Sequence, residues 1–340
     1  MNAMERYRAV IEGQPVDTLP RLPILMAFAA HFVDSNYRAF ASDFRVLVEA
    51  NLRCLEHFGF EQVSAISDPF RETQGFGAEI TFPEDSVPRC VKPPLEDDKN
   101  LDPLAVPEPY RSERMLDRMR AVEALHRAVG ATHSVLGWVE GPAAEAADLR
   151  GVTNFLTDLI ADPEYAAALM DRCLDTGIEF AVAQVRAGAD TIGIGDAIAS
   201  QISPDMYRQF VLPRERALVD AIHQEGGLVR LHICGDTTHL LEGFAELGCD
   251  IVDLDWQVDL GRARELLGPA QTLLTNLDPV RAVQNGTPDS IRSQVRELYA
   301  AVGNPLMVGA GCEIPPGTPN EHLEALCAPV SYAANPGGTE

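Results

Sequence analysis

The amino-acid sequence predicts an α/β protein that forms a single (β/α)8 barrel. Apolar runs of strand length alternate with helical patterns along the chain, as in parallel α/β folds. Three of these runs share one pattern, in which a glycine precedes the run and an aspartate ends it: 59–68, 188–196 and 248–255. The glycine suits the left-handed residue after a helix, and the continuous apolar run suits a strand buried on both faces.

Further apolar runs bring the expected number of strands to eight: 23–28, 134–139, 228–233, 272–275 and 306–309. Helical patterns between the strands include 206–227 and 239–248. An open, doubly wound sheet is the alternative architecture. The sequence contains neither a G-x-G-x-x-G turn nor a P-loop, which disfavours the nucleotide-binding versions of that alternative.

The domain organisation follows from the same patterns. Residues 1–22 are expected to form a leading helix and turn, 23–327 the barrel, and 328–340 a frayed tail. Residues 82–109 are rich in proline and acidic residues and form an insertion after the second strand. This insertion is either a hairpin-like cover over the barrel mouth or a solvated surface excursion.

Composition and charge exclude several classes of protein. The 340 residues carry a formal net charge of −24, which argues against binding to nucleic acid or to an anionic membrane. No apolar stretch approaches 18 residues and no leader peptide is recognisable, so we expect no membrane span. Seven scattered cysteines lack the regularity of a disulfide framework, which fits a reducing cytoplasm. A monomer and a homodimer are both compatible with the sequence.

A candidate zinc site carries the strongest chemical signal. His232 and Cys234 lie two residues apart in LVRLHICGDTTH (228–239), and alternation along a strand directs them to one face. Cys312 closes a second apolar run, LMVGAGCEIPPGTP (306–319). One imidazole and two thiolates suit zinc and leave a fourth position open, which is typical of a catalytic site.

The alternative is that these residues belong to the core, since free cysteine often behaves as a small buried hydrophobe. The separation of Cys234 and Cys312 in the sequence matches no local zinc-finger spacing. Position in a barrel favours the zinc site, because both thiols would lie at the carboxyl ends of strands, where barrel active sites form.

Carboxylates are expected at the same end of the barrel. Asp68, Glu140, Asp196 and Asp255 would end strands two, three, four and six. Glu140 is a candidate proton donor or polar contact, or else caps the following helix. Asp196 is a candidate substrate contact or a helix cap. Asp255 is a fourth zinc ligand, a partner that orients His232, or an ordinary loop aspartate.

The two tryptophans are further substrate-binding candidates. Trp138 precedes Glu140 at the end of strand three, and Trp256 follows Asp255. Both could form the wall of an aromatic or corrin-facing pocket. The alternative for each is ordinary packing at the barrel rim.

Longer stretches of the chain resemble the uroporphyrinogen decarboxylase superfamily. They are ERYRAVIEGQPVDTLPRLPI, ISPDMYRQFVLPRERALVDAIHQEGG, TNLDPV and GCEIPPGTPNEHL, and together they reach from one end of the chain to the other. The resemblance implies a (β/α)8 barrel. Asn276, within TNLDPV, completes the expected substrate-binding residues.

The chain departs from the decarboxylases of this superfamily at decisive points. They carry an R-Q-A-G-R motif after the first strand, which grips carboxylates, whereas residues 22–32 here contain no arginine. They also have a histidine at the position of Cys312. Asp68 does match their pyrrole-binding aspartate, and we expect it, with Glu140, to be catalytic.

The departures resemble the zinc-dependent methyltransferase branch, which includes the methylcobalamin:coenzyme M methyltransferases. Its H-x-C-G motif and later G-C segment match His232, Cys234, Gly235 and Cys312. The resemblance implies zinc and a corrinoid. The sequence has no D-x-H-x-x-G motif for cobalamin, so a separate corrinoid protein would supply it.

The expected activity is methyl transfer between a corrinoid and a small-molecule thiol, ether or amine. Zinc lowers the pKa of a bound thiol, which makes it a methyl acceptor, and the reverse direction would demethylate a donor. A decarboxylase and a non-catalytic barrel with structural zinc are the alternatives.

Overall fold

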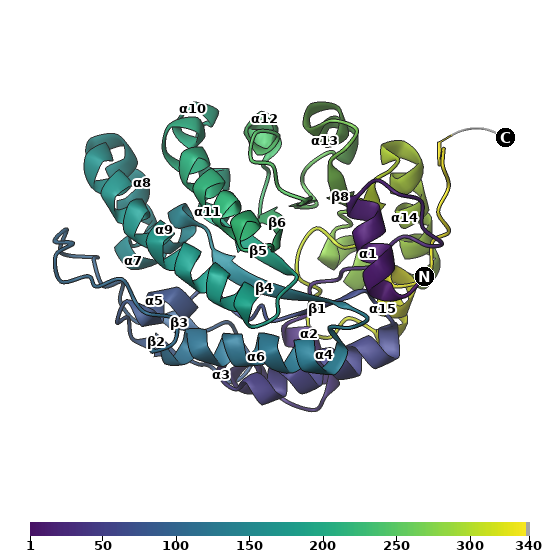
Figure 1. Ribbon diagram of the computed structural model, residues 1–340, viewed down its shortest axis with the longest axis horizontal. Coiled ribbons are helices and arrows are strands. Elements are labelled where there is room, and N and C mark those ends of the chain that lie inside the picture. The colour runs from purple at the N-terminus through teal and green to yellow at the C-terminus, as the bar shows by residue number, and fades with distance from the viewer. Residues whose placement is uncertain (338–340) are drawn as a thin grey trace.

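Seven parallel strands form the centre of the protein in a computed structural model that describes residues 1–337. The order in the sheet is β1-β4-β5-β6-β7-β8-β9, so each strand lies beside the next along the chain. Their bounds are β1 Gln62–Ser64, β4 Ser134–Glu140, β5 Thr191–Gly195, β6 Leu228–Ile233, β7 Ile251–Leu254, β8 Thr272–Leu274 and β9 Leu306–Met307. Helices surround this curled sheet (Figure 1), and the fold is barrel-like.

The α-helices account for about half of the remaining chain. Their bounds are α1 Ala3–Ile11, α2 Ala27–Phe32, α3 Tyr37–Ser42, α4 Phe44–Phe58, α5 Arg71–Gly75, α6 Glu113–Val129, α7 Pro142–Arg150, α8 Val152–Ala161, α9 Pro163–Arg186, α10 Pro204–Met206, α11 Leu212–Gln224, α12 Leu241–Phe244, α13 Leu260–Leu267, α14 Pro288–Val302 and α15 Asn320–Leu326. Within residues 1–337, no helix is long and apolar enough to cross a membrane.

Two expected helices are divided by short turns of other types. The segment 206–227 is expected as one helix but contains the π-turn η2 (Tyr207–Val211) between α10 and α11. Pro213, just after this turn, lacks the N–H that a continuous α-helix needs. The segment 239–248 begins with the 3-10 turn η3 (Thr238–Leu240) before α12. Two further short turns are η1 (Ala197–Gln201) and the π-turn η4 (Pro279–Gln284).

The expected first strand over 23–28 is wrong, because these residues are extended only in part and α2 begins at Ala27. The segment 20–24 nevertheless lies between β9 and β1. Leu22 N donates to Val308 O at 2.7 Å, and Glu61 N donates to Arg21 O at 2.9 Å. Two prolines in the segment, Pro20 and Pro23, lack the donors of a regular ladder. The barrel is therefore completed by an irregular segment and not by an eighth strand.

The N-terminal helix α1 covers the amino-terminal end of the strands. Tyr7 and Val10 pack with Ile251, Leu274 and Met307, which lie on β7, β8 and β9. The Tyr7 hydroxyl is fully buried, lies 2.7 Å from Thr191 Oγ1 and accepts a hydrogen bond from Gln62. Because α1 covers this end, a site is expected at the carboxyl ends of the strands, where barrel active sites form.

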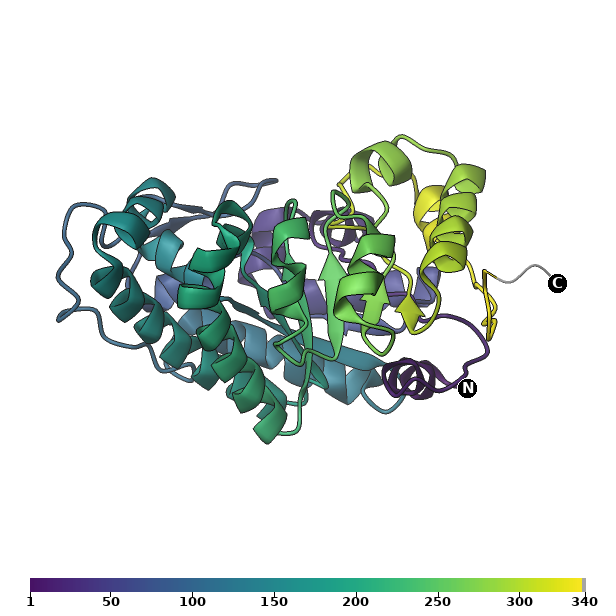
Figure 2. The ribbon, with the colours of Figure 1, turned by 90° about the horizontal axis from the view of Figure 1, so that it is seen from above.

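The chain termini and the acidic insertion lie outside the central seven-stranded sheet. Thr18 forms an antiparallel bridge with Ser331, so the segment expected to fray from residue 328 is anchored at its start; residues 338–340 lie outside the described residues. Figure 2 shows α1 at the same end of the molecule as the C-terminal helices. The insertion begins as a hairpin, in which β2 (Ile80–Thr81) pairs with β3 (Arg89–Cys90).

We predict that Tyr7→Phe lowers the free energy of unfolding by about 1–2 kcal/mol, because the hydroxyl is buried and hydrogen-bonded between two strands. Urea unfolding measures the change. Tyr110→Phe is the matched control, since Tyr110 is 60% exposed. Equal losses in the two variants would contradict the sealing role of Tyr7.

Candidate metal centre and its cavity

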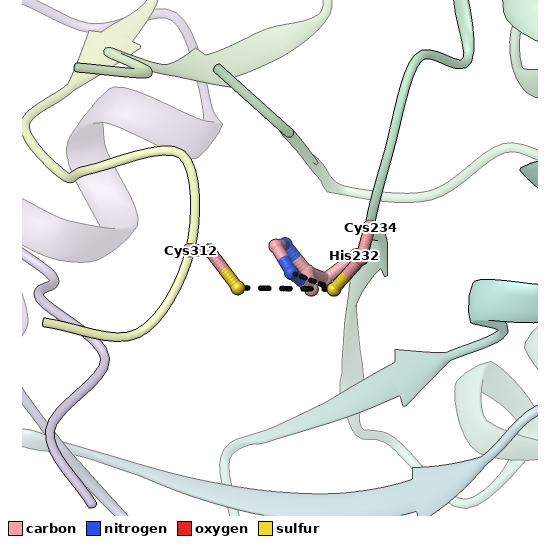
Figure 3. A group of neighbouring side chains, drawn as sticks. All are labelled: His232, Cys234 and Cys312. Atoms are coloured by element: carbon pink, nitrogen blue, oxygen red, sulfur yellow. Dashed lines mark hydrogen bonds between the residues drawn. The ribbon is translucent and has the colours of Figure 1, made fainter. Parts of the chain in front are cut away.

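His232, Cys234 and Cys312 come together at the carboxyl ends of the strands (Figure 3). His232 lies near the end of β6, Cys234 directly follows that strand, and Cys312 lies in the loop after β9. His232 Nε2 is 3.2 Å from Cys234 Sγ, and the two sulfurs are 3.8 Å apart. The three ligand atoms lie within 4.8 Å of one another, which suits a single metal ion.

The second nitrogen of His232 faces a buried carboxylate. His232 Nδ1 lies 3.3 Å from Asp253 Oδ2, and Asp253 is the register partner of His232 on β7. The same Asp253 oxygen accepts two hydrogen bonds from Arg230, at 3.0 and 2.6 Å. The contact is electrostatic, because His232 Nδ1 has no hydrogen-bond partner among the described residues. The other ring nitrogen, Nε2, faces Cys234 and is the one available to a metal.

Asp255 does not contact His232. The carboxylate beside this ring belongs to Asp253 and not, as expected, to Asp255. Asp255 Oδ2 accepts a hydrogen bond from Gly235 N at 3.0 Å, and Oδ1 accepts from Gln257 N at 3.0 Å. Gly235 has a φ of +95°, a conformation that suits glycine. Asp255 therefore holds the turn that directly follows Cys234.

The three side chains shift one another's pKa values, because they lie close together. The hydrogen bond from Cys234 and the charge of His232 lower the pKa of Cys312 to about 5, although burial opposes this shift. Burial alone would lower the pKa of His232, but Cys234 and Asp253 raise it well above its usual value. The centre without a metal therefore pairs a thiolate with a protonated imidazole, and metal binding would displace the remaining protons.

A cavity of about 200 Å³ adjoins the three residues. Its wall is mainly apolar and contains, besides the metal-ligand candidates, Ile24, Met26, Ile66, Asp68, Pro69, Trp138, Glu140, Gly195, Ala197 and Glu313. Trp138 lies over β5, where a Cβ on Gly193 would approach its ring to 2.2 Å and one on Gly195 to 2.8 Å. The two glycines of β5 therefore make the room that this tryptophan occupies.

Glu140 lies in the cavity wall with one oxygen already engaged. Its Oε1 accepts hydrogen bonds from Arg71 Nη2 at 2.8 Å and from Trp138 Nε1 at 3.1 Å. Burial raises the pKa of Glu140 well above its usual value; Arg71 lowers it, but Glu72 adds to the rise. A carboxyl group whose pKa is raised binds a proton more readily than an ordinary glutamate, which suits a proton donor.

Asp68 also reaches the cavity wall, but in the opposite electrostatic state. It forms an ion pair with Arg114 and accepts a hydrogen bond from Ser67 at 2.8 Å. Burial raises its pKa, but the charges of Arg114 and Arg71 outweigh burial and lower it. Asp68 is therefore ionised, and its charge is compensated.

Three other expected substrate contacts do not line this cavity. Asp196 accepts hydrogen bonds from Ala143 N and Ala144 N, so it caps α7. Asn276 donates to the backbone oxygens of Asp255 and Val258. Trp256 is 40% exposed and, with Asn276, borders a separate hollow beside α14. The insertion 82–109 contributes no residue to the cavity wall in the described part of the chain.

Several residues of the site were missed by the sequence analysis. Arg71 follows Asp68 closely in the sequence, and Glu313 directly follows Cys312, so their proximity was an available signal. Burial raises the pKa of Glu313 to about 7, and its Oε1 accepts from Ala27 N at 2.9 Å. The sequence alone points to Asp255 and not to Asp253, because only the register of β6 and β7 shows which of the two lies beside His232.

The sequence profile of the uroporphyrinogen decarboxylase (URO-D) family matches residues 2–331. The chain belongs to the uroporphyrinogen decarboxylase family. Within it, the chain is 30% identical to the methylcobamide:CoM methyltransferase MtbA of Methanosarcina mazei over 95% of both proteins. It is 27% identical to the uroporphyrinogen decarboxylase of Actinobacillus pleuropneumoniae serotype 5b over 88% of both.

Solved structures give the same architecture. A methyltransferase from Methanosarcina mazei superposes with a TM-score of 0.89 at 25% identity, covering 96% of this chain and 98% of that one. A B12-independent methionine synthase from Shewanella sp. W3-18-1 shares the fold, with a TM-score of 0.58 at 14% identity over 92% of this chain and 95% of that one. The family fold therefore extends over nearly the whole chain.

We predict that the purified protein binds one zinc ion per chain and that Cys312→Ser lowers the zinc content strongly, because one of the three ligand atoms is lost. Elemental analysis after dialysis measures the content. Cys90→Ser is the matched control, since Cys90 lies on the insertion hairpin. Equal zinc in wild type and Cys312→Ser would remove Cys312 from the ligand set.

Asp253→Asn is expected to weaken zinc binding by about 10–100-fold, because an amide no longer holds the His232 ring as a carboxylate does. Competition with a chromogenic chelator measures the affinity. Asp250→Asn is the control, since Asp250 contacts His223 at the other end of the same strand. An unchanged affinity in Asp253→Asn would show that the contact does not support the metal.

Proposed function

We propose that this protein is a zinc-dependent methyltransferase that moves a methyl group between a corrinoid and a small-molecule thiol, ether or amine. The observation that carries the proposal is the His232, Cys234 and Cys312 cluster, which adjoins a small cavity at the carboxyl ends of the strands. Structural zinc sites usually have four protein ligands, whereas three ligands beside a cavity leave a position for a substrate.

The described residues fit zinc on two grounds. The donor set is one nitrogen and two sulfurs within 4.8 Å of one another, and Asp253 stands behind His232. When bound, zinc would supply a Lewis-acidic centre that lowers the pKa of a substrate thiol. His232, Cys234 and Cys312 would hold it, and Asp255 would fix the backbone beside Cys234.

Glu140 is the proposed proton-handling group. Its Oε1 is engaged by Arg71 and Trp138, so Oε2 is the oxygen that would carry or accept a proton beside the substrate. Trp138 shapes the adjoining wall, and the ion pair with Arg114 keeps Asp68 fixed. Glu140 and Asp68 thus have distinct roles, because one carboxyl retains a proton and the other is ionised.

The corrinoid and its carrier enter the proposal through the relatives, several of which are named methylcobamide:CoM methyltransferases. Since the chain has no D-x-H-x-x-G motif, we propose that a separate corrinoid protein docks over the carboxyl ends of the strands. The acidic insertion 82–109 would be a gate beside that docking surface. The seven unpaired cysteines fit a reducing cytoplasm.

Decarboxylation of uroporphyrinogen is disfavoured by the cavity itself. Its volume of about 200 Å³ lies below the roughly 300–1,000 Å³ of pockets for larger ligands. None of the residues that line it is a lysine or arginine that could pair with the carboxylates of that substrate. The segment 22–32, which contains no arginine, offers no compensation.

The test mixes zinc-loaded protein with methylcobalamin and candidate thiols, and follows the formation of cob(I)alamin spectrally. The reverse assay uses cob(I)alamin with methoxylated aromatics or methylamines. We expect one of these reactions to occur and Cys234→Ala to abolish it, because that variant loses a metal ligand. Cys90→Ala should retain full activity. Conversion of uroporphyrinogen to coproporphyrinogen in place of methyl transfer would overturn the proposal.

We expect Glu140→Gln to lower the rate of methyl transfer by roughly 10²–10⁴-fold, because an amide cannot donate or accept the proton. Its zinc content should equal that of the wild type, since Glu140 lies outside the ligand cluster. Single-turnover rates and elemental analysis on the same preparations separate the two effects. A wild-type rate in this variant would exclude Glu140 from proton transfer.

A further inference from the structure

We infer that the small-molecule substrate of this site is a compact, uncharged molecule and that an anionic thiol is excluded. The inference rests on the proposed function and narrows its substrate class. It follows from the charges, the size and the apolar character of the cavity beside His232, Cys234 and Cys312.

The charges that surround the cavity disfavour an anion. The wall presents the carboxyl groups of Asp68, Glu140 and Glu313. A divalent metal held by two thiolates and a neutral imidazole contributes no net positive charge. An anionic group entering the cavity would therefore lose its hydration without gaining a counter-charge, which is costly.

Two arginines lie behind this wall, and each forms an ion pair with one of its carboxyl groups. Arg71 is fully buried and bonds Glu140, while Arg114 is 5% exposed and pairs with Asp68. Neither arginine is among the residues that line the cavity in the described chain. They neutralise the carboxyl groups of the wall. Arg71 Nη1 and Arg114 Nε have no hydrogen-bond partner among the described residues, but both atoms are buried and neither arginine lines the cavity, so a substrate there meets no cationic side chain.

The same pairing disfavours a cationic substrate. An ammonium group would have to compete with Arg114 for Asp68 and with Arg71 for Glu140, and both arginines are already within contact distance. Glu313 accepts a hydrogen bond from Ala27 N at 2.9 Å, which engages one of its oxygens. An uncharged molecule avoids the desolvation cost of either charge.

The shape of the cavity completes the substrate class. Ile24, Met26, Ile66 and Pro69 form an apolar wall around a volume of about 200 Å³, and Trp138 adds a flat aromatic surface. Such a site favours a short aliphatic or single-ring group beside the metal.

The experiment compares three thiols of similar size: 2-mercaptoethanol, 2-mercaptoethanesulfonate and 2-aminoethanethiol. Each is titrated into zinc-loaded Trp256→Phe protein, in which Trp138 is the remaining tryptophan and lines the cavity. We expect the neutral thiol to quench Trp138 fluorescence with an affinity at least tenfold higher than either charged thiol. Equal or tighter binding of the sulfonate or the ammonium compound would overturn the inference.

A gain-of-binding variant tests the electrostatic cause. Met26→Lys places a cation in the apolar wall, and we expect it to raise the affinity for the sulfonate at least tenfold relative to the neutral thiol. Ile160→Lys, at a residue that is 78% exposed on α8, is the control and should leave the ranking unchanged. The same change in both variants would overturn the electrostatic explanation.

The binding assay tests the inference about charge and the transfer assay tests the proposed function, so one can fail while the other succeeds. If no thiol, ether or amine exchanges a methyl group with a corrinoid, the proposed function fails, although the ranking of the thiols can still be measured. If transfer proceeds fastest with the sulfonate, the methyltransferase function stands and the inference about charge falls.

Discussion

The contact between Asp253 and both Arg230 and His232 is the interaction on which the site depends. A buried carboxylate without a partner is costly, and Arg230 compensates Asp253 through two hydrogen bonds. Arg230 in turn donates to Gln62 at 3.0 Å, and Gln62 donates to the hydroxyl of Tyr7. A polar chain therefore runs through the barrel from α1, which closes one end, to the candidate metal ligands at the other.

The two ends of this chain have different functions because of their surroundings. At the amino-terminal end, Tyr7 is buried and packs with apolar side chains that include Val10 and Met307. At the carboxyl end, the glycines of β5 admit Trp138, and a cavity remains beside the metal ligands. The barrel thus supplies a rigid base and places the reactive groups at its open end.

The carboxyl groups around the cavity differ in their affinity for a proton, because burial raises a pKa whereas an ion pair with arginine lowers it. Asp68 and Glu140 both face the cavity and both contact an arginine, yet their pKa values shift in opposite directions. For Asp68 the positive charges dominate, whereas for Glu140 burial and the neighbouring carboxylates dominate. The wall can therefore hold a proton at one position while its overall charge remains compensated, which favours methyl transfer to or from an uncharged molecule.

The sequence by itself determined the positions of seven strands and singled out the three residues that the fold brings together as a candidate metal centre, because apolar periodicity and the H-x-C-G motif are local signals. Only the tertiary structure decided that prolines keep segment 20–24 out of a regular strand. It also decided that Asp253, and not Asp255, faces His232, and that Asp196, Trp256 and Asn276 lie away from the cavity. The physical reason is that these outcomes depend on strand register and loop packing, which join residues distant in the chain.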